Sequence, residues 1–236
     1  MSVPKLPPLD GSLTLPAVLD FQLLHNPDLS AYVFSAENSE QTAYISFREL
    51  VRACHRAAFA VRPLGTGHDR ETVAILALTD TCVYHTTVLG VLRAGLVVSI
   101  VILFPSSPEL IEHQPFLISP RNSVPAVLHL LKTTSCHRVI TTKETLKSLL
   151  HSVTSALRES DPGYELSIEQ VPSLQTLFPR LGQETEQDPF TPYPEIEVSL
   201  NDIALYIHSS GTTGLPKAIP LTQVYIIQNV AFRKLP

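Results

Sequence analysis

The apolar run Thr72–Leu78 (TVAILAL) is the feature that most restricts how this chain folds. A strand with one face in water alternates apolar and polar residues, whereas a run that is apolar almost throughout is typical of a parallel strand buried on both faces. Parallel strands need crossover connections, and we expect a helix directly afterwards, over about 81–94. The run therefore predicts a sheet that is covered by helices on both sides.

Strand and helix patterns alternate along the rest of the chain. We expect strands at 31–34, 42–45, 138–141, 165–171, 203–207 and 218–221, and helices at 15–25, from 46, from 123 and at 143–158. Ser46-Phe-Arg-Glu49 is a capping box, and the helix that it opens would place Leu50, Cys54, Ala57 and Val61 on one face. Prolines recur between 172 and 197 and predict an irregular surface connection. Together these elements predict an α/β fold with a layered, largely parallel sheet flanked by helices.

The composition narrows the function classes. With 236 residues, 44% of them hydrophobic, the chain can form one large domain or part of one. Its net charge of -5 and its scattered basic and aromatic residues do not support nucleic-acid binding. The spacing of Cys54, Cys82 and Cys136 fits neither a metal site nor a disulfide framework, which indicates structural thiols in a reducing compartment. Prolines interrupt the apolar core that an N-terminal signal peptide needs, so we expect a cytoplasmic protein. From the cysteine spacing we expect no metal site.

The segment Thr86–Phe104 is nearly long and apolar enough to span a bilayer. Arg93 lies inside it, however, and Gly95 is typical of a helix C-cap. The uncharged remainder, 95–104, is too short to cross a membrane by itself. We therefore do not expect a membrane span here.

The segment Tyr206–Thr222 (YIHSSGTTGLPKAIPLT) gathers hydroxyls, glycines and one lysine between two apolar runs. Glycine lacks a Cβ, so Gly211 and Gly214 allow backbone amides to turn toward a bound group. Successive amides of that kind suit phosphate oxygens, and Lys217 adds a compact positive charge. Further hydroxyl donors would come from Ser209, Ser210, Thr212 and Thr213. The pattern favours a loop that holds the phosphates of a nucleotide.

The same residues also suit an ordinary hairpin turn, because Ser, Thr and Gly are common turn residues. The segment does not follow the P-loop pattern G-x-x-x-x-G-K-[ST], since Lys217 is followed by Ala218 and then by a strand rather than a helix. Composition alone therefore supports the hairpin turn and the phosphate loop equally.

A family resemblance separates these two alternatives. The sequence SSGTTGLPK (209–217), after an apolar strand that ends in Tyr-Ile-His, resembles the AMP-binding signature of the adenylate-forming superfamily. That group includes acyl-CoA synthetases, luciferases, the adenylation domains of peptide synthetases and carboxylic acid reductases. Similar segments occur at 42–50, 72–78 and 88–95. The segments 7–12, 115–123 and 134–140 are most similar to fungal peptide-synthetase-like, reductase-type proteins.

The resemblance implies an enzyme that joins a carboxylate to AMP, releases pyrophosphate, and passes the acyl group to coenzyme A or a phosphopantetheine arm. ATP and Mg²⁺ are the implied cofactors, and carrier and reductase domains are candidate partners. The residues implied to hold the phosphates are Ser209, Ser210, Gly211, Thr212, Thr213, Gly214 and Lys217. We expect His208 to be a satisfied structural histidine and keep it as a further candidate. We expect Arg121 to be a solvated or capping residue rather than an anion ligand.

The resemblance also places much of the enzyme's machinery beyond Pro236. The adenine-binding and carboxylate-binding segments, the ribose-binding aspartate, the hinge and the catalytic lysine of a small C-terminal domain would all follow the loop. We therefore expect no catalytic residue in this chain, no acyl-adenylate formation by the chain alone, and no indication of which carboxylate is used. The alternative is a non-catalytic nucleotide-binding pseudoenzyme or an interaction protein.

Two segments depart from the family pattern. That pattern would run from Val97 directly into Pro115, so the residues between, 98–114, are a suspected insertion. Every valine codon begins with GT and one glutamine codon is CAG, the letters at the two ends of an intron, so we interpret this segment as a translated intron. The pattern is lost again at 224–236. We expect 1–223 to form a partial AMP-binding domain and the chain alone to be poorly soluble, because an apolar run at 96–104 would be an aggregation hazard.

Overall fold

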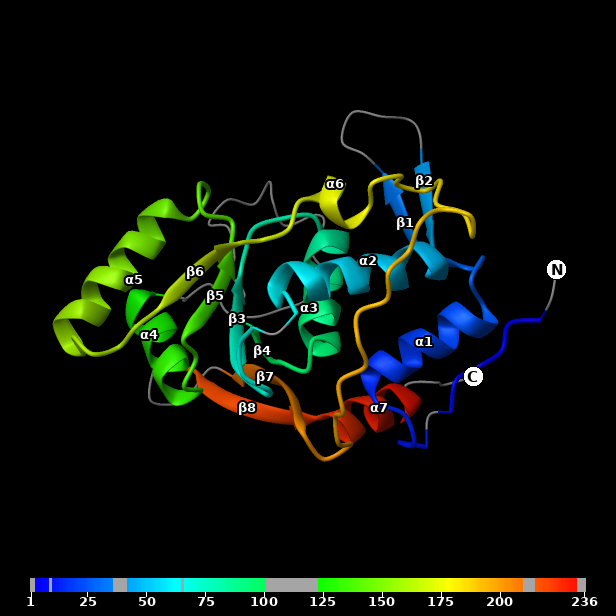
Figure 1. Cartoon of the computed structure of the whole chain (residues 1–236). Coiled ribbons are helices and arrows are strands. Elements are labelled where there is room, and N and C mark those ends of the chain that lie inside the picture. The colour runs from blue at the N-terminus through cyan, green and yellow to red at the C-terminus, as the bar shows by residue number, and fades with distance from the viewer. Residues whose placement is uncertain are drawn as a thin grey trace.

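A six-stranded sheet, in the order β6-β5-β3-β4-β7-β8, organises the fold (Figure 1). The computed structural model describes residues 3–8, 10–35, 42–64, 66–100, 123–209 and 215–232. The strands are β3 (Thr72–Leu76), β4 (Val97–Ile100), β5 (Arg138–Thr141), β6 (Ser167–Gln170), β7 (Ile203–Ser209) and β8 (Lys217–Thr222). All neighbouring strands run parallel except β7 and β8, which pair antiparallel. The predicted α/β fold with a largely parallel sheet is confirmed.

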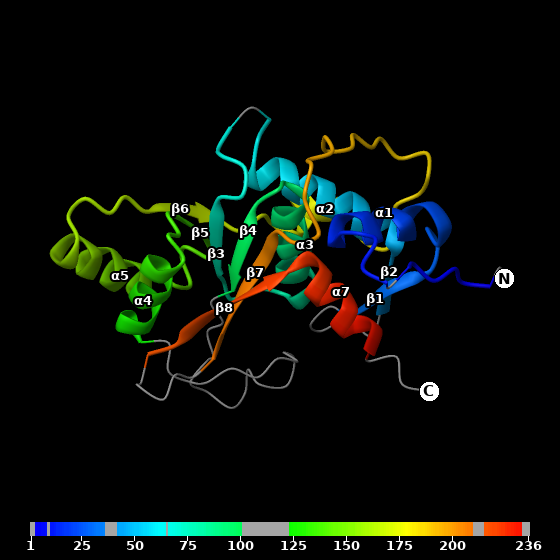
Figure 2. The same cartoon turned by 90° about the horizontal axis from the view of Figure 1, so that it is seen from below.

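Helices cover both faces of this sheet, as the apolar run predicted. The helices α2 (Phe47–Val61) and α3 (Thr81–Arg93) lie on one side, and α4 (Val124–Thr133) and α5 (Lys147–Ser160) lie on the other (Figure 2). In β3, Val73 and Ile75 belong to the core on the α2 and α3 side, whereas Ala74 and Leu76 belong to the core on the α4 and α5 side. The strand ends at Leu76, two residues earlier than expected.

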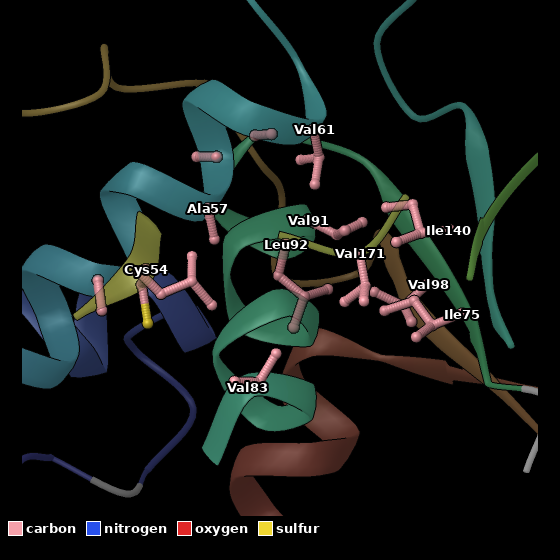
Figure 3. Close-up of a cluster of buried hydrophobic side chains, with 14 of the residues drawn as sticks. Cys54, Ala57, Val61, Ile75, Val83, Val91, Leu92, Val98, Ile140 and Val171 are labelled. Carbon is pink, nitrogen blue, oxygen red and sulfur yellow. The ribbon is translucent and has the colours of Figure 1, made fainter. Parts of the chain in front are cut away.

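The larger core lies between α2, α3 and the sheet (Figure 3). Ala57 and Val61 of α2 and Val91 and Leu92 of α3 are almost completely buried there. Val98, Ile75 and Ile140 approach them from three neighbouring strands (Figure 3). The predicted apolar face of α2 is confirmed, because its four expected members are all buried.

Only one of the two hydrogen bonds of the predicted capping box forms at the start of α2. Ser46 is the N-cap, and its Oγ accepts a hydrogen bond of 3.2 Å from the Glu49 amide. The Glu49 side chain does not complete the box, because its Oε1 accepts a 2.6 Å bond from the Gly182 amide instead. The side chain of Glu49 thus connects α2 to a segment far along the chain.

The first part of the chain packs beside the larger core. The helix α1 (Leu15–His25) begins and ends where the sequence predicted, and a hairpin of β1 (Ser30–Ser35) and β2 (Thr42–Ser46) follows it. Arg93 of α3 is buried and makes two hydrogen bonds to Asp20 of α1, at 2.7 and 3.2 Å. None of the described helices is long and apolar enough to cross a membrane.

Residues 178–198, here called the strap, connect the region after β6 to β7 and cross α2 (Figure 1). The segment is irregular, as predicted, apart from the short helix α6 (Leu174–Leu177) that precedes it. It is not simply a surface connection, however, because Phe178 and Tyr193 are buried. Glu184 is buried as well, and it pairs with two arginines of α2. The burial of Phe178, Tyr193 and Glu184 corrects the prediction of a surface connection.

The remaining helices differ slightly from their predicted bounds. Ser123 is the N-cap of α4 but makes no side-chain capping bond, and 143–146 forms a turn before α5. The helix α7 (Gln223–Phe232) follows β8. Of the suspected insertion, Val98–Ile100 forms most of β4. The rest of it, and Arg121, lie outside the described residues.

Candidate phosphate-binding hairpin

The antiparallel pairing of β7 and β8 brings the two ends of the hydroxyl-rich loop together. Ser209 lies directly opposite Lys217, and His208 lies opposite Ala218. Directly opposed residues of an antiparallel pair point to the same face of the sheet and have neighbouring side chains. Of the predicted phosphate-binding residues, the structure therefore places Ser209, Lys217 and His208 at the base of one hairpin. Residues 210–214 lie outside the described part of the chain.

The hairpin begins at the edge of the sheet where ligands commonly bind. The strands β3, β4, β5 and β7 are parallel, so their carboxyl ends share one edge. Ligands of open α/β sheets bind outside the carboxyl ends of the strands. Ser209 is the last residue of β7, so the loop leaves the sheet at this edge.

Lys217 offers a positive charge that is not neutralised within the described parts of the chain. Its side chain is exposed, and it has no ion pair or hydrogen bond with any residue that the structure describes. A lysine ammonium is a compact point charge with three donors, and it suits phosphate oxygens. Ser209 adds a hydroxyl on the same face of the hairpin.

His208 is the buried polar residue of the hairpin. Its exposed fraction is 6%, and its Nε2 has no hydrogen-bond partner. Burial lowers the pKa of His208, so the imidazole is neutral near pH 7. The sequence suggested a structural histidine whose hydrogen-bonding groups are satisfied. The Nε2 atom of His208 does not meet that expectation, because it has no partner.

The donor set fits a polyphosphate better than a protein-bound metal ion. The described ranges hold no group of three His, Cys, Asp or Glu side chains that could bind a metal. The hairpin base instead combines an ammonium, a hydroxyl and an unpartnered imidazole. With the glycines and hydroxyls of 210–214, this set suits the oxygens of a nucleotide triphosphate, which themselves bind Mg²⁺.

The cysteines have no place in this chemistry. Cys54, Cys82 and Cys136 are buried and free. Burial raises the pKa of Cys54 to about 12 and the pKa values of Cys82 and Cys136 to about 11. Because the thiolate is the reactive form, all three are inert at neutral pH.

A cavity of about 200 Å³ lies away from the hairpin loop, at the opposite edge of the sheet. Its lining includes Val97 and Ile203, the first residues of β4 and β7. Arg70 and Asp202, which also line it, form an ion pair of 3.0 Å. The cavity lies at the amino ends of β4 and β7, and its arginine is paired with Asp202, so we do not assign it to the nucleotide.

Comparison with known proteins identifies the family. The AMP-binding enzyme family matches residues 19–235, and this chain belongs to it. The matched range includes 98–114 and all but the last residue of 224–236, the two segments that depart from the expected pattern. The signature at 209–217 and the fold thus agree with a family assignment made over most of the chain.

Curated relatives are fungal proteins that are much longer. The chain is 41% identical over 224 residues to the adenylate-forming reductase Nps11 of Serpula lacrymans, and the match covers 94% of this chain and 18% of that protein. It is 33% identical over 229 residues to the adenylate-forming reductase Nps10 of Heterobasidion annosum, covering 92% of this chain and 19% of that protein. The chain thus spans about a fifth of the length of these relatives.

Solved structures share the fold at low sequence identity. A fatty acyl-CoA synthetase of Mycobacterium tuberculosis superposes with a TM-score of 0.60 at 18% identity, over 91% of this chain and 35% of that one. The adenylation domain of a carboxylate reductase of Mycobacterium chelonae gives a TM-score of 0.57 at 18% identity, over 92% and 35%. At these identities the likeness supports the fold alone.

Proposed function

We propose that this chain is the N-terminal, phosphate-holding part of an enzyme that activates a carboxylic acid as an acyl-adenylate at the expense of ATP. The observation that carries the proposal is the register of the hairpin, which places Ser209 opposite Lys217 at the carboxyl edge of the sheet. Both residues belong to the signature of a family to which the chain belongs. The names of the fungal relatives support the adenylating activity.

The residues of this chain would act by holding and neutralising phosphate. Lys217 and the hydroxyl of Ser209 would contact phosphate oxygens, together with hydroxyls and amides from 210–214. Negative charge develops on the leaving pyrophosphate during adenylation, and fixed donors that face it stabilise the transition state electrostatically. Mg²⁺ bound to the phosphates would share that charge.

The later steps belong to the intact enzyme. We propose that the acyl group then passes to coenzyme A or to a phosphopantetheine arm, and that carrier and reductase domains act with this domain. The word reductase in the names of the fungal relatives supports the reductive outcome. We place no catalytic residue in this chain, and we expect it to bind nucleotide without forming acyl-adenylate.

Isothermal titration of the purified chain with Mg·ATP tests the proposal. Saturable binding is expected, and Lys217→Ala should weaken it about tenfold or more, because a lost charge-assisted contact costs about 1.5–3 kcal/mol. Lys147→Ala, which removes an exposed lysine at the start of α5, should leave the affinity unchanged. Absence of binding by the folded chain would overturn the proposal.

ATP–pyrophosphate exchange, measured on the same preparation, distinguishes a chain that only binds the nucleotide from a chain that also forms acyl-adenylate. Binding without exchange is expected, because we place no catalytic residue in this chain. Robust exchange with any carboxylate would show that the chain is catalytically complete.

A further inference from the structure

A buried histidine without a hydrogen-bond partner lies at the base of the phosphate-binding hairpin. His208 is 6% exposed, and its Nε2 is one of the buried side-chain atoms for which the structure provides no partner. A buried polar group that stays unpaired destabilises the fold, so native proteins leave few of them. Such a group requires an explanation.

Another buried histidine shows the usual arrangement. His55 is 5% exposed, and its Nδ1 accepts a hydrogen bond of 2.9 Å from the Tyr193 amide. Its ring also contacts Phe190, with the ring centroids 5.1 Å apart. Nδ1 of His55 thus has a hydrogen-bond partner and its Nε2 lies 3.9 Å from Asp20 Oδ1, whereas Nε2 of His208 is buried with no partner.

The position of His208 relates this unpaired atom to the loop. It is followed at once by Ser209, which faces Lys217 across the hairpin, and it is itself opposed by Ala218. Alanine provides no hydrogen-bonding side chain. His208 points to the face of the sheet opposite to Ser209 and Lys217, because successive residues of a strand alternate. A ligand bound beyond the end of β7 could thus be contacted from both faces of the sheet.

We propose that His208 is a further phosphate-binding residue of this hairpin, and that its Nε2–H donates a hydrogen bond to a phosphate oxygen of the bound nucleotide. This inference rests on the proposed function, since it concerns the same site. A neutral imidazole carries one N–H donor, and a phosphate oxygen is a strong acceptor. Binding would therefore satisfy a group that the free protein leaves unpaired.

Amide variants test which ring nitrogen is used. Glutamine can place an N–H near the position of Nε2, whereas asparagine reaches only as far as Nδ1. Titrated with Mg·ATP and with magnesium pyrophosphate, His208→Gln should bind within about threefold of the unmodified chain, and His208→Asn should bind about tenfold more weakly. A purely structural histidine would show no such preference in affinity once both variants are folded. Equal affinity of the two variants and the unmodified chain would overturn the inference.

A spectroscopic measurement on the unmodified chain does not depend on variants that fold. In chain labelled with ¹⁵N-histidine, magnesium pyrophosphate should shift the Nε2 resonance of His208 and slow the exchange of its proton. The resonances of His55 serve as the internal control and should not move. An unchanged His208 ring at saturating pyrophosphate would overturn the inference.

Lys217→Ala separates this inference from the proposed function. If that variant loses Mg·ATP affinity while His208→Asn keeps it, the hairpin binds phosphate and His208 has no part in it. If the unmodified chain does not bind Mg·ATP or pyrophosphate, the proposed function and the role of His208 fail together.

Discussion

At the scale of single residues, Glu184 holds the strap on α2. Its Oε1 lies 3.1 Å from Arg52 Nη1 and 2.6 Å from Arg56 Nη2, and its side chain is only 1% exposed. Arg52 also donates to the Thr185 carbonyl oxygen at 2.8 Å. Loss of a buried carboxylate that pairs with two guanidinium groups leaves uncompensated buried charge.

Glu184→Gln should therefore destabilise the fold by about 3 kcal/mol, measured by urea unfolding, because breaking a buried ion pair from one side costs about 3–5 kcal/mol. The control is Asp28→Asn, which removes an ion pair with Arg48 whose carboxylate is 84% exposed. An exposed pair contributes about 0–1 kcal/mol. Similar losses in the two variants would contradict the assignment of Glu184 as the strap's anchor.

His55 makes the stability of the fold depend on pH. Burial, and then the nearby Arg93 guanidinium, lower the pKa of His55 to about 3. The contact between His55 Nε2 and Asp20 Oδ1, at 3.9 Å, is too long for a hydrogen bond and does not offset this. Between pH 6.5 and 3 the unfolded chain binds a proton here that the native chain does not, so stability falls as the pH falls.

We expect this group alone to lower the free energy of unfolding by about 2 kcal/mol between pH 7.5 and pH 5. His55→Asn keeps an acceptor for the Tyr193 amide and removes the titrating ring. Its stability, measured by urea unfolding at both pH values, should therefore change by about 2 kcal/mol less than that of the unmodified chain. An unchanged pH dependence in the variant would count against a neutral, buried His55.

At the scale of elements, α2 and α3 approach each other through a glycine. A Cβ at Gly90 of α3 would lie 2.3 Å from the Ala57 Cβ of α2. Such a contact forces the helices apart, and overpacking of this kind costs about 1–3 kcal/mol. The close approach explains why the larger core needs small residues here.

Gly90→Ala should therefore lower the melting temperature, even though alanine favours a helix by about 1 kcal/mol over glycine. Gly163→Ala is the matched control, because its Cβ would meet nothing nearer than 4.0 Å. A Gly90→Ala variant as stable as the control would show that the two helices can separate without cost.

The helices and strands also show which structural features can be predicted from the sequence. The apolar run of β3, the apolar face of α2 and the bounds of α1 follow from periodicity and end signals, and they were predicted correctly. The burial of Glu184 and Arg52 and their ion pair were not predicted, because charged residues are usually exposed and this pairing joins positions far apart in sequence. The phosphate loop was proposed from glycines and hydroxyls, whereas the unpaired Nε2 of His208 is a property of packing that no local pattern indicates.

We propose that 98–114 is an insertion. Because its first residues lie in β4, its removal should change the stability of the sheet. Ser99, a polar residue, is 4% exposed in the middle of the sheet. In a chain that lacks 98–114, Val97 would join Pro115, and Phe116 would take the position of Ser99. Removal of the segment should raise both the soluble yield and the melting temperature. A deletion variant that no longer unfolds cooperatively would contradict the proposal, and a native transcript that retains these codons would exclude an intron.

At the scale of the whole molecule, the chain corresponds to only part of the length of its relatives. It matches the AMP-binding family over 19–235 and spans 18% of Nps11. Within that part the sheet, its helices and the strands of the hairpin are in place, so the chain holds the elements that would position the proposed phosphate site. The sequence pattern at 224–236, which we interpret as a departure from the family, stays a prediction for the transcript to test.

The central claim, that the nucleotide phosphates lie at the β7–β8 hairpin, is tested most directly with an acyl-phosphate derivative of ATP, which acylates the lysine nearest to the bound phosphates. The lysines available are Lys5, Lys132, Lys143, Lys147, Lys217 and Lys234. After digestion, mass spectrometry should find Lys217 labelled above all others, and excess Mg·ATP should suppress that label alone. Equal labelling of all lysines, or ATP-sensitive labelling of another lysine with Lys217 unmodified, would contradict the claim.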